Sequence, residues 1–293
     1  MNRFFGNKKA IALFILPAMV LFTALVFYPV LQVLFRSFYD WDGLGKGIFI
    51  GVDNYIKIFD DTIFKTAVKN GLIFAAIITV YQIGIGSILA FAVSNVRIKG
   101  RNFFRIVYFL PVVLSVTVVC QLWLNVFNTE FGLLNKLMEV VGIDFRQSWL
   151  DDRYKAIYVL AFVNAWHYVG YQFALLLAGI KSIPSTYYEA AKIDGASSFL
   201  AHIKITIPML SETYKFCLVM SITGGLNAFT QMYIMTGGGP GTSTYTLTFL
   251  MYRSAFQTYQ YGYGMTAATI LVIECLVATI LINKLIARKH ITY

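Results

Sequence analysis

Residues 71–93, GLIFAAIITVYQIGIGSILAFAV, decide the fold class, because this run of 23 residues contains no charged side chain. A transmembrane α-helix needs roughly 20 consecutive apolar residues to cross the hydrocarbon core of a bilayer. The whole chain has the same character, with 58% of its 293 residues hydrophobic and 13% charged. Soluble globular chains carry about 45–50% apolar and about 25% charged residues. The sequence therefore predicts an all-α membrane protein.

Five further apolar runs on either side of this stretch have the length of a membrane span. The fifth of the six is the weakest, because Gly224 and Gly225 interrupt it, and we place its start at Pro208, since proline suits the first turn of a helix. The first run is too long for the apolar part of a signal peptide, so we interpret it as a retained span. We expect one transmembrane domain over residues 1–293, with spans near 11–34, 71–93, 106–127, 157–177, 208–231 and 265–286.

The distribution of charge predicts the orientation of these spans. The chain has 24 Lys and Arg against 14 Asp and Glu, a net charge of +10. The N-terminus, the loops after spans two and four and the C-terminal tail have a balance of +11, while the other loops are close to neutral. The positive-inside rule places the basic side, and with it both termini, in the cytoplasm. The basic residues on this side are Arg3, Lys8, Lys9, Arg97, Lys99, Arg101, Arg105, Lys181, Lys192, Lys204, Lys284, Arg288 and Lys289, against Glu189 and Asp194.

Sequence signatures of enzyme chemistry are missing from the chain. It has no Walker A pattern for nucleotide, no H-E-x-x-H, no G-x-S-x-G and no Cys or His cluster with metal-ligand spacing. Cys120, Cys217 and Cys275 lie in apolar runs, where cysteine is usually a packing residue. We therefore expect no catalytic residue, no metal site and no cofactor in this chain.

One ionisable residue leaves a second class of transporter open. Glu274 is the only acid well inside a predicted span, near the middle of the sixth. Coupled carriers use intramembrane acids to carry the driving ion, so a self-contained secondary carrier that uses Glu274 is an alternative. A carboxyl group that bonds to a neighbouring helix is the interpretation we favour, because no partner acid or base accompanies it.

The loop between spans four and five, residues 183–208, carries the most specific pattern. Pro184 is a helix-start signal, and Gly195 is placed to end the short helix that follows. The loop resembles the EAA loop of binding-protein-dependent ABC importer permeases, in which EAA is followed by three residues, G, nine residues and I-x-L-P. In this chain the motif reads Glu189-Ala190-Ala191, Gly195 and Ile205-Thr206-Ile207-Pro208, with Ile207 in place of leucine.

Short segments outside the motif resemble the carbohydrate-uptake branch of these permeases. They are Gly51-Val52-Asp53-Asn54-Tyr55, Ala178-Gly179-Ile180, Asp194-Gly195-Ala196 and Gly238-Gly239-Pro240. The resemblance implies six spans in a prokaryotic inner membrane and import of solute by alternating access. It also implies a cytoplasmic helix that docks on a separate ATPase through Glu189, Ala190, Ala191, Asp194, Gly195 and Pro208.

The same resemblance implies an assembly of several subunits. A second homologous permease, two ABC ATPase subunits and an extracellular solute-binding protein are the expected partners, together with the lipid bilayer but no nucleic acid. ATP and Mg would be bound by the ATPase subunits and not by this chain. The outer loop from Gly237 to Gly264 and the long first loop are candidate docking surfaces for the binding protein.

Polar side chains recur at helical spacing on spans three, four and five, where they are costly unless they line a pathway or join helices. Neutral amides and aromatic rings suit hydroxyl-rich sugars, and no Lys or Arg lies in the middle of a span to bind a phosphate. We therefore favour a neutral sugar or oligosaccharide over a solute such as a phosphorylated polyol, while bonding between helices is an equal alternative for each residue. The candidates are Gln121, Trp123, Asn125, Asn164, Trp166, His167, Tyr171, Thr223, Asn227, Phe229, Gln231 and Tyr233.

Overall fold

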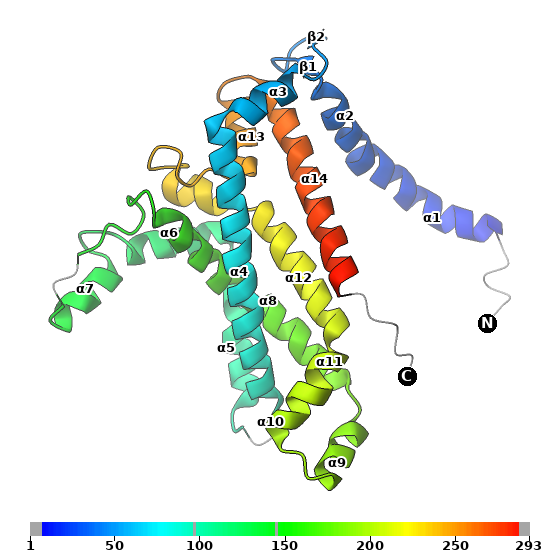
Figure 1. Cartoon of the computed structure of the whole chain (residues 1–293), viewed down its shortest axis with the longest axis vertical. Helices are drawn as coiled ribbons and strands as arrows, with labels where there is room; N and C mark the ends of the chain where they lie inside the picture. Colours follow the sequence, from blue (N-terminus) through cyan, green and yellow to red (C-terminus); the bar gives the residue numbers. More distant parts are fainter. Residues whose placement is uncertain (1–7, 96–97, 144–145, 287–293) are drawn as a thin grey trace. The chain divides into compact units, whose positions relative to one another are not determined.

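The computed structural model describes residues 8–95, 98–143 and 146–286 of the chain, which are mostly helical (Figure 1). Contacts divide the chain into two units, residues 1–61 with 250–270, and residues 62–249 with 271–293. Four basic residues of the orientation argument, Arg3, Arg97, Arg288 and Lys289, lie outside the described residues. So do both chain ends, so the predicted cytoplasmic termini stay a prediction.

The first unit begins with a long apolar helix. Helix α1 (Lys8–Phe22), the π-helical segment η1 (Thr23–Phe27) and α2 (Tyr28–Arg36) follow one another without a break. A small antiparallel hairpin comes next, in which β1 (Tyr39–Asp40) pairs with β2 (Ile48–Phe49). Helix α3 (Asp53–Asp60), the second part of α13 (Leu247–Phe256) and the first part of α14 (Tyr261–Leu285) complete the unit.

Buried polar contacts hold the hairpin and α3 to the start of α14. The Asn54 Nδ2 group donates to the carbonyl oxygens of Ser37 and Tyr39, both at 2.9 Å. The Thr266 hydroxyl donates to the same Ser37 carbonyl at 3.1 Å. Gly262 contacts the Tyr39 carbonyl so closely that no side chain fits there. Two carbonyl groups of this irregular segment, those of Ser37 and Tyr39, are thus satisfied by side chains from other elements.

The second unit is a bundle of helices, in which α4 packs against α8 and α12, and α8 also packs against α5. The helix α9 extends from one end of α8, and α12 runs back beside α4 (Figure 1). Its elements are α4 (Thr62–Ser94), α5 (Arg101–Val113), α6 (Val116–Val126), α7 (Leu133–Val140), α8 (Ala156–Ser182), α9 (Ser185–Ile193), α10 (Ser198–Ala201), η2 (His202–Thr206), α11 (Ile207–Met209), α12 (Ser211–Leu226) and η3 (Met232–Thr236), with parts of α13 and α14.

Glycines allow the helices of this bundle to approach closely. A Cβ atom at Gly86 of α4 would lie 3.1 Å from Gln172 Cβ on α8, and one at Gly170 of α8 would lie 2.6 Å from the Tyr108 carbonyl oxygen on α5. A Cβ atom at Gly225 of α12 would lie 2.6 Å from the Cα atom of Ala75 on α4. Small residues at crossings are typical of membrane helices, whose association depends on van der Waals packing and hydrogen bonds between helices.

Three single helices among the described residues have the length and hydropathy of a membrane span. They are Ile11–Arg36, Thr62–Ser94 and Tyr261–Leu285, which correspond to the predicted spans one, two and six. Helix α8 contains the predicted fourth span and extends it to Ser182. The count of six spans remains a prediction.

The predicted third and fifth spans differ from the structure. The third is not one helix, because α5 and α6 are bent by 97° at Leu114 and Ser115. The carbonyl oxygen of Leu114 lies 3.1 Å from His167 Nε2, so α8 satisfies a backbone group that the bend releases. The fifth ends at Leu226 and not at residue 231, because the chain leaves the helix at Asn227 and becomes helical again only from Thr230.

Candidate functional site: a cavity at the break after helix α12

A cavity of about 360 Å³ lies in the second unit, where α4, α8 and α12 meet the non-helical residues that follow α12. Irregular backbone at membrane depth is tolerated where it is buried in protein or lines a water-filled cavity. The Ala228 carbonyl oxygen at this break accepts hydrogen bonds from the hydroxyl groups of Thr246 and Thr248, at 3.2 Å and 2.6 Å. Polar or aromatic residues in the wall are Gln82, Asn164, Tyr168, Tyr171, Gln172, Ser221, Asn227, Phe229, Thr230 and Gln231.

Four buried side chains in the cavity wall form a directed chain of hydrogen bonds. Gln172 Nε2 on α8 donates to Ser221 Oγ on α12 at 2.7 Å. Ser221 Oγ then donates to Gln82 Oε1 on α4 at 3.1 Å. Gln82 Nε2 donates in turn to Asn164 Oδ1, back on α8, at 3.3 Å. The chain, which we call the amide chain, ties three helices together at the cavity.

The amide chain fixes which groups Asn164 offers to the cavity. Because Asn164 Oδ1 accepts from Gln82, the amide is oriented with its Nδ2 group as the remaining donor. No hydrogen bond from Asn164 Nδ2 occurs within the described part of the chain. Gln172 Oε1 is likewise buried without a partner there. The wall therefore contains one amide donor, Asn164 Nδ2, and one amide acceptor, Gln172 Oε1, that do not join helices among the described residues.

Five of the twelve predicted pathway residues line this cavity: Asn164, Tyr171, Asn227, Phe229 and Gln231. The two aromatic residues among them, Tyr171 and Phe229, each stack on an aromatic neighbour close by in the sequence. Tyr168 stacks on Tyr171 with ring centroids 6.1 Å apart, and Tyr233 stacks on Phe229 at 5.3 Å.

The other seven predicted residues lie outside the cavity wall. They are Gln121, Trp123, Asn125, Trp166, His167, Thr223 and Tyr233. Trp123 belongs to an aromatic cluster on α6 and α8, with its ring 5.4 Å from that of Trp166. Asn125 Nδ2 donates to the Gln121 carbonyl, and the Thr223 hydroxyl donates to the Val219 carbonyl. Both side chains therefore form a hydrogen bond to the backbone of their own helix.

Sequence reasoning missed Gln82, Gln172 and Ser221, which form most of the amide chain. Polar residues that repeat along one helix predicted the pathway, whereas α4 and α12 each contribute a single residue, Gln82 and Ser221, to the amide chain. Gln82 did give a signal, because it is the only amide in the apolar run 71–93.

The loop predicted to carry the coupling motif is a helix–turn–helix. The predicted short helix is confirmed as α9, which begins at Ser185, directly after Pro184. Gly195 has a φ angle of +76°, the left-handed conformation that ends a helix readily only with glycine. The Thr206 hydroxyl, fully buried, lies 2.9 Å from Tyr188 Oη and 3.1 Å from His202 Nδ1. These contacts join α9 to η2.

The outer surface of this loop is accessible. No residue of α9 is buried, and Glu189, Ala190 and Asp194 are exposed while Ala191 is half-buried. Ile193 is 87% exposed and Phe199 is 75% exposed, although both are large apolar side chains. Pro208, predicted to start the fifth span, lies in α11 and is half-buried.

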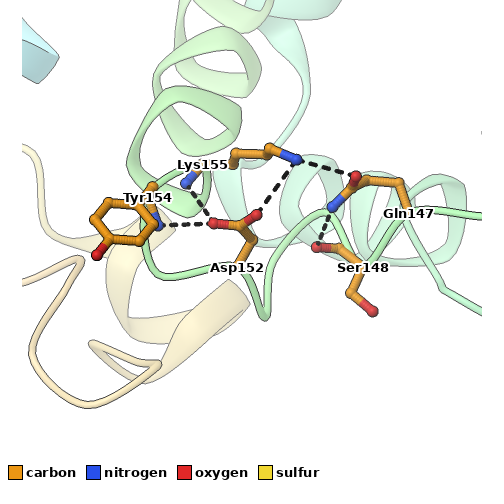
Figure 2. A network of polar contacts seen from close by, with 5 residues as sticks. All are labelled: Gln147, Ser148, Asp152, Tyr154 and Lys155. Atoms are coloured by element: carbon orange, nitrogen blue, oxygen red, sulfur yellow. Dashed lines mark hydrogen bonds and ion pairs between the residues drawn. The ribbon is translucent and has the colours of Figure 1, made fainter.

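A second polar network fixes the segment that enters α8 at its other end (Figure 2). The Asp152 carboxylate accepts hydrogen bonds from the backbone N–H groups of Tyr154 at 2.8 Å and Lys155 at 3.2 Å. Lys155 Nζ lies 3.3 Å from the other Asp152 oxygen and donates to Gln147 Oε1 at 3.0 Å. The Tyr154 N–H, more than any other group, holds the pKa of Asp152 below its usual value.

Glu274 lies in the second unit on α14, half-buried and close to the end of α12. Its neighbour Cys275 accepts a hydrogen bond from Asn227 Nδ2 at 3.4 Å, so this part of α14 lies beside the break that lines the cavity. Within the described ranges, Glu274 makes no ion pair.

The chain is similar to membrane subunits of transport systems. The family model described as "Binding-protein-dependent transport system inner membrane component" matches residues 82–291. Probable ABC transporter permease protein YurN of Bacillus subtilis is 37% identical over 281 residues, covering 95% of this chain and 96% of the relative. Multiple sugar-binding transport system permease protein MsmF of Streptococcus mutans is 36% identical over 274 residues, covering 93% of each chain.

A solved structure shares the fold. It is a bacterial alginate ABC transporter in complex with alginate pentasaccharide-bound periplasmic protein. The TM-score is 0.83 at 22% sequence identity, over 95% of this chain and 94% of that one.

Proposed function

The chain belongs to the family of binding-protein-dependent transport system inner membrane components, and from this premise we propose that it carries a neutral sugar or oligosaccharide across the membrane by alternating access. It is a multi-pass permease subunit of an ABC importer in the inner membrane, and not an enzyme. The observation that carries the substrate class is the cavity after α12. Among the described residues, its wall contains amides, hydroxyls and aromatic rings but no charged side chain.

The composition of this wall suits a sugar. A sugar hydroxyl both donates and accepts hydrogen bonds, and Asn and Gln side chains carry both kinds of group. The rings of Tyr171 and Phe229 supply flat apolar faces of the kind that pack on the C–H face of a sugar ring. A phosphorylated solute would call for Arg or Lys, and no such residue appears in the part of the wall that the structure describes.

Movement of the cavity is proposed to start at the α9 loop. Tyr188 and Thr206 join α9 to η2, and η2 continues through α11 into α12. From the first residue of α12 to Ser221 is ten residues, or about 15 Å of helix. A force on α9 is therefore delivered along one short path to the helix that holds Ser221 and the break after Leu226.

The subunits that would exert and use this force follow from the family. We propose that an ATPase subunit receives α9 in a cleft, with Glu189 facing a basic side chain and Ile193 and Phe199 covered on docking. A second homologous permease, a second ATPase and an extracytoplasmic binding protein complete the assembly, and the ATPases bind ATP and Mg. This arrangement uses six spans with both termini in the cytoplasm, on the side of α9.

Two substitutions in the loop test the coupling. Glu189→Lys reverses the charge on α9, and Gly195→Trp places a bulky side chain at a φ angle that only glycine adopts easily. In proteoliposomes that contain the assembled transporter, both variants should hydrolyse ATP with little or no uptake. Glu139→Lys, an equal charge reversal at an exposed site on α7, is the control and should leave uptake normal. Normal uptake in both loop variants would contradict the coupling role.

A separate experiment tests the cavity. Asn164→Leu keeps a similar volume but removes the amide that accepts from Gln82, so uptake of a neutral oligosaccharide should fall while ATP hydrolysis continues. The same liposomes are offered sn-glycerol 3-phosphate in competition. Efficient transport of the phosphate ester, with no competition by neutral sugars, would contradict the substrate class.

A further inference from the structure

A long apolar groove lies on the outside of the bundle between α5 and α8. It has a volume of about 470 Å³, and eight of its ten lining residues are apolar, among them Ile106 and Val113 of α5 and Leu177 of α8. The other two are Arg105 and Lys181. Val113 is 70% exposed, so the groove opens outward and not into the bundle. No part of the cavity after α12 contributes to it.

Both cations lie at the same end of the groove, because α5 and α8 run in opposite directions. His167 of α8 contacts the carbonyl of Leu114, directly after α5, whereas Phe173, further along α8, packs on Tyr108, earlier in α5. Rising numbers on α8 therefore meet falling numbers on α5. Arg105 lies near the start of α5, and Lys181 near the end of α8.

Neither cation is neutralised by an acid among the residues that the structure describes. Within residues 8–95, 98–143 and 146–286, neither Arg105 nor Lys181 forms an ion pair. One guanidinium nitrogen of Arg105 donates to Asn102 Oδ1 at 3.3 Å, while its Nε is buried without a partner. The groove thus combines an apolar lining with two positive charges at one end that form no ion pair among the described residues.

We propose that this groove binds one anionic phospholipid, with the phosphate between Arg105 and Lys181 and an acyl chain along α5 and α8. Basic pockets between membrane helices at the cytoplasmic side are typical sites for anionic headgroups. A soluble phosphate would use the two cations but not the apolar groove, and an apolar helix of a partner subunit would use the groove but not the cations. An anionic lipid uses both features, with its phosphate on the cations and its acyl chain in the groove.

The site lies directly beside the proposed coupling loop. Lys181 is followed by the last residue of α8, and α9 begins at Ser185. A bound lipid would therefore brace the end of α8 from which α9 extends. The proposal itself does not depend on the transported solute, so failure of either one leaves the other standing.

Native mass spectrometry of the assembled transporter in detergent tests the proposal. Phosphatidylglycerol and phosphatidylcholine are titrated separately, and the affinity of the tightest site is measured for each. A cation near the membrane surface contributes about 1 kcal/mol to binding of an anionic lipid, or roughly fivefold in affinity. Arg105→Gln and Lys181→Gln should therefore each weaken phosphatidylglycerol roughly fivefold, and the double variant roughly 25-fold, with phosphatidylcholine unchanged.

Two further variants separate this site from general attraction to the membrane. Lys284→Gln removes an exposed cation in the last turn of α14, which the proposed topology places on the same membrane face, and should have no effect. Ala178→Phe fills the groove without a change of charge and should weaken both lipids. Equal affinity for the two lipids in the wild type, an equal effect of Lys284→Gln, or no lipid retained by the assembled transporter would each overturn the proposal.

Discussion

Replacing Gly225 with alanine tests the packing of the helices that enclose the cavity. A Cβ atom there would lie 2.6 Å from Ala75 Cα and 2.9 Å from Ile78 Cδ1, both on α4. The nearest atom is backbone, so α12 and α4 must separate by about 0.8 Å before the contact reaches the ordinary 3.4 Å. Overpacking of this kind costs about 1–3 kcal/mol, and the better helix propensity of alanine returns about 1 kcal/mol. The net loss of stability should be about 0–2 kcal/mol relative to the wild type, and about 1–3 kcal/mol relative to a variant that gains the same propensity without the contact.

The adjacent glycine provides a matched control. No atom lies within 4 Å of a Cβ placed at Gly224, although it belongs to the same turn of α12. Gly224→Ala therefore gains helix propensity with no new contact, and its stability should stay the same or rise by up to about 1 kcal/mol. Both variants add one methyl group, at adjacent positions of α12. The difference between their stabilities therefore isolates the contact with Ala75.

The measurement is thermal unfolding of the assembled transporter in one detergent, followed by intrinsic fluorescence. A change of 1 kcal/mol shifts the midpoint by roughly 2–4 °C for a chain of 150–250 residues. We therefore expect Gly225→Ala to unfold up to roughly 8 °C below the wild type and roughly 2–12 °C below Gly224→Ala, with Gly224→Ala at or above the wild type. A Gly225→Ala variant as stable as Gly224→Ala would refute the close crossing of α4 and α12.

Three further substitutions test the polar contacts. Ser221→Ala removes the hydroxyl that links Gln82 to Gln172. Hydrogen bonds between membrane helices average about 0.6 kcal/mol, with a maximum near 1.7, so the loss of two should lower stability by about 1–3 kcal/mol in the same unfolding assay and weaken the apparent affinity for sugar in uptake. Unchanged values would refute the amide chain. Tyr188→Phe removes the hydroxyl that joins α9 to η2, so amide hydrogen exchange in α9 should quicken, and an unchanged rate would mean that this bond does not hold the loop. The pKa of Asp152 is lowered from its usual 3.8, so its stabilising contacts are complete at neutral pH and are lost as the pH falls below 3.8 through the lowered pKa. The rate of hydrogen exchange at the start of α8, corrected for the intrinsic effect of pH on exchange, should rise over that range in the wild type and should already be fast at neutral pH in Asp152→Ala. Protection that does not change with pH would contradict the network.

Local signals made the α9 loop predictable. Pro184 and Gly195 lie on either side of a short segment of good helix formers, and glycine is the residue that the observed φ angle of Gly195 requires. Such punctuation acts through the backbone of the residue itself, so it can be read without knowledge of the fold. The apolar runs of α4 and α14 were predictable for a similar reason, because length and hydropathy belong to one segment.

Features that depend on contacts between helices were not predictable in this way. The bend after α5 has a local signal, Pro111, but the bend is completed by the contact of the Leu114 carbonyl with His167 on α8. The amide chain draws its members from three helices, and no periodicity along one helix reveals that Gln82 meets Ser221. Periodicity on α6 instead selected Gln121 and Asn125, which lie outside the cavity wall.

The energy source of transport distinguishes an ATP-driven permease from a secondary carrier that uses Glu274. The assembled transporter is placed in proteoliposomes with its binding protein, and uptake of a neutral oligosaccharide is measured with ATP on the side of α9. Uptake should require ATP, stop with vanadate, and continue in the presence of a protonophore and in Glu274→Gln. Uptake without ATP that follows a proton gradient and is lost in Glu274→Gln would contradict the account.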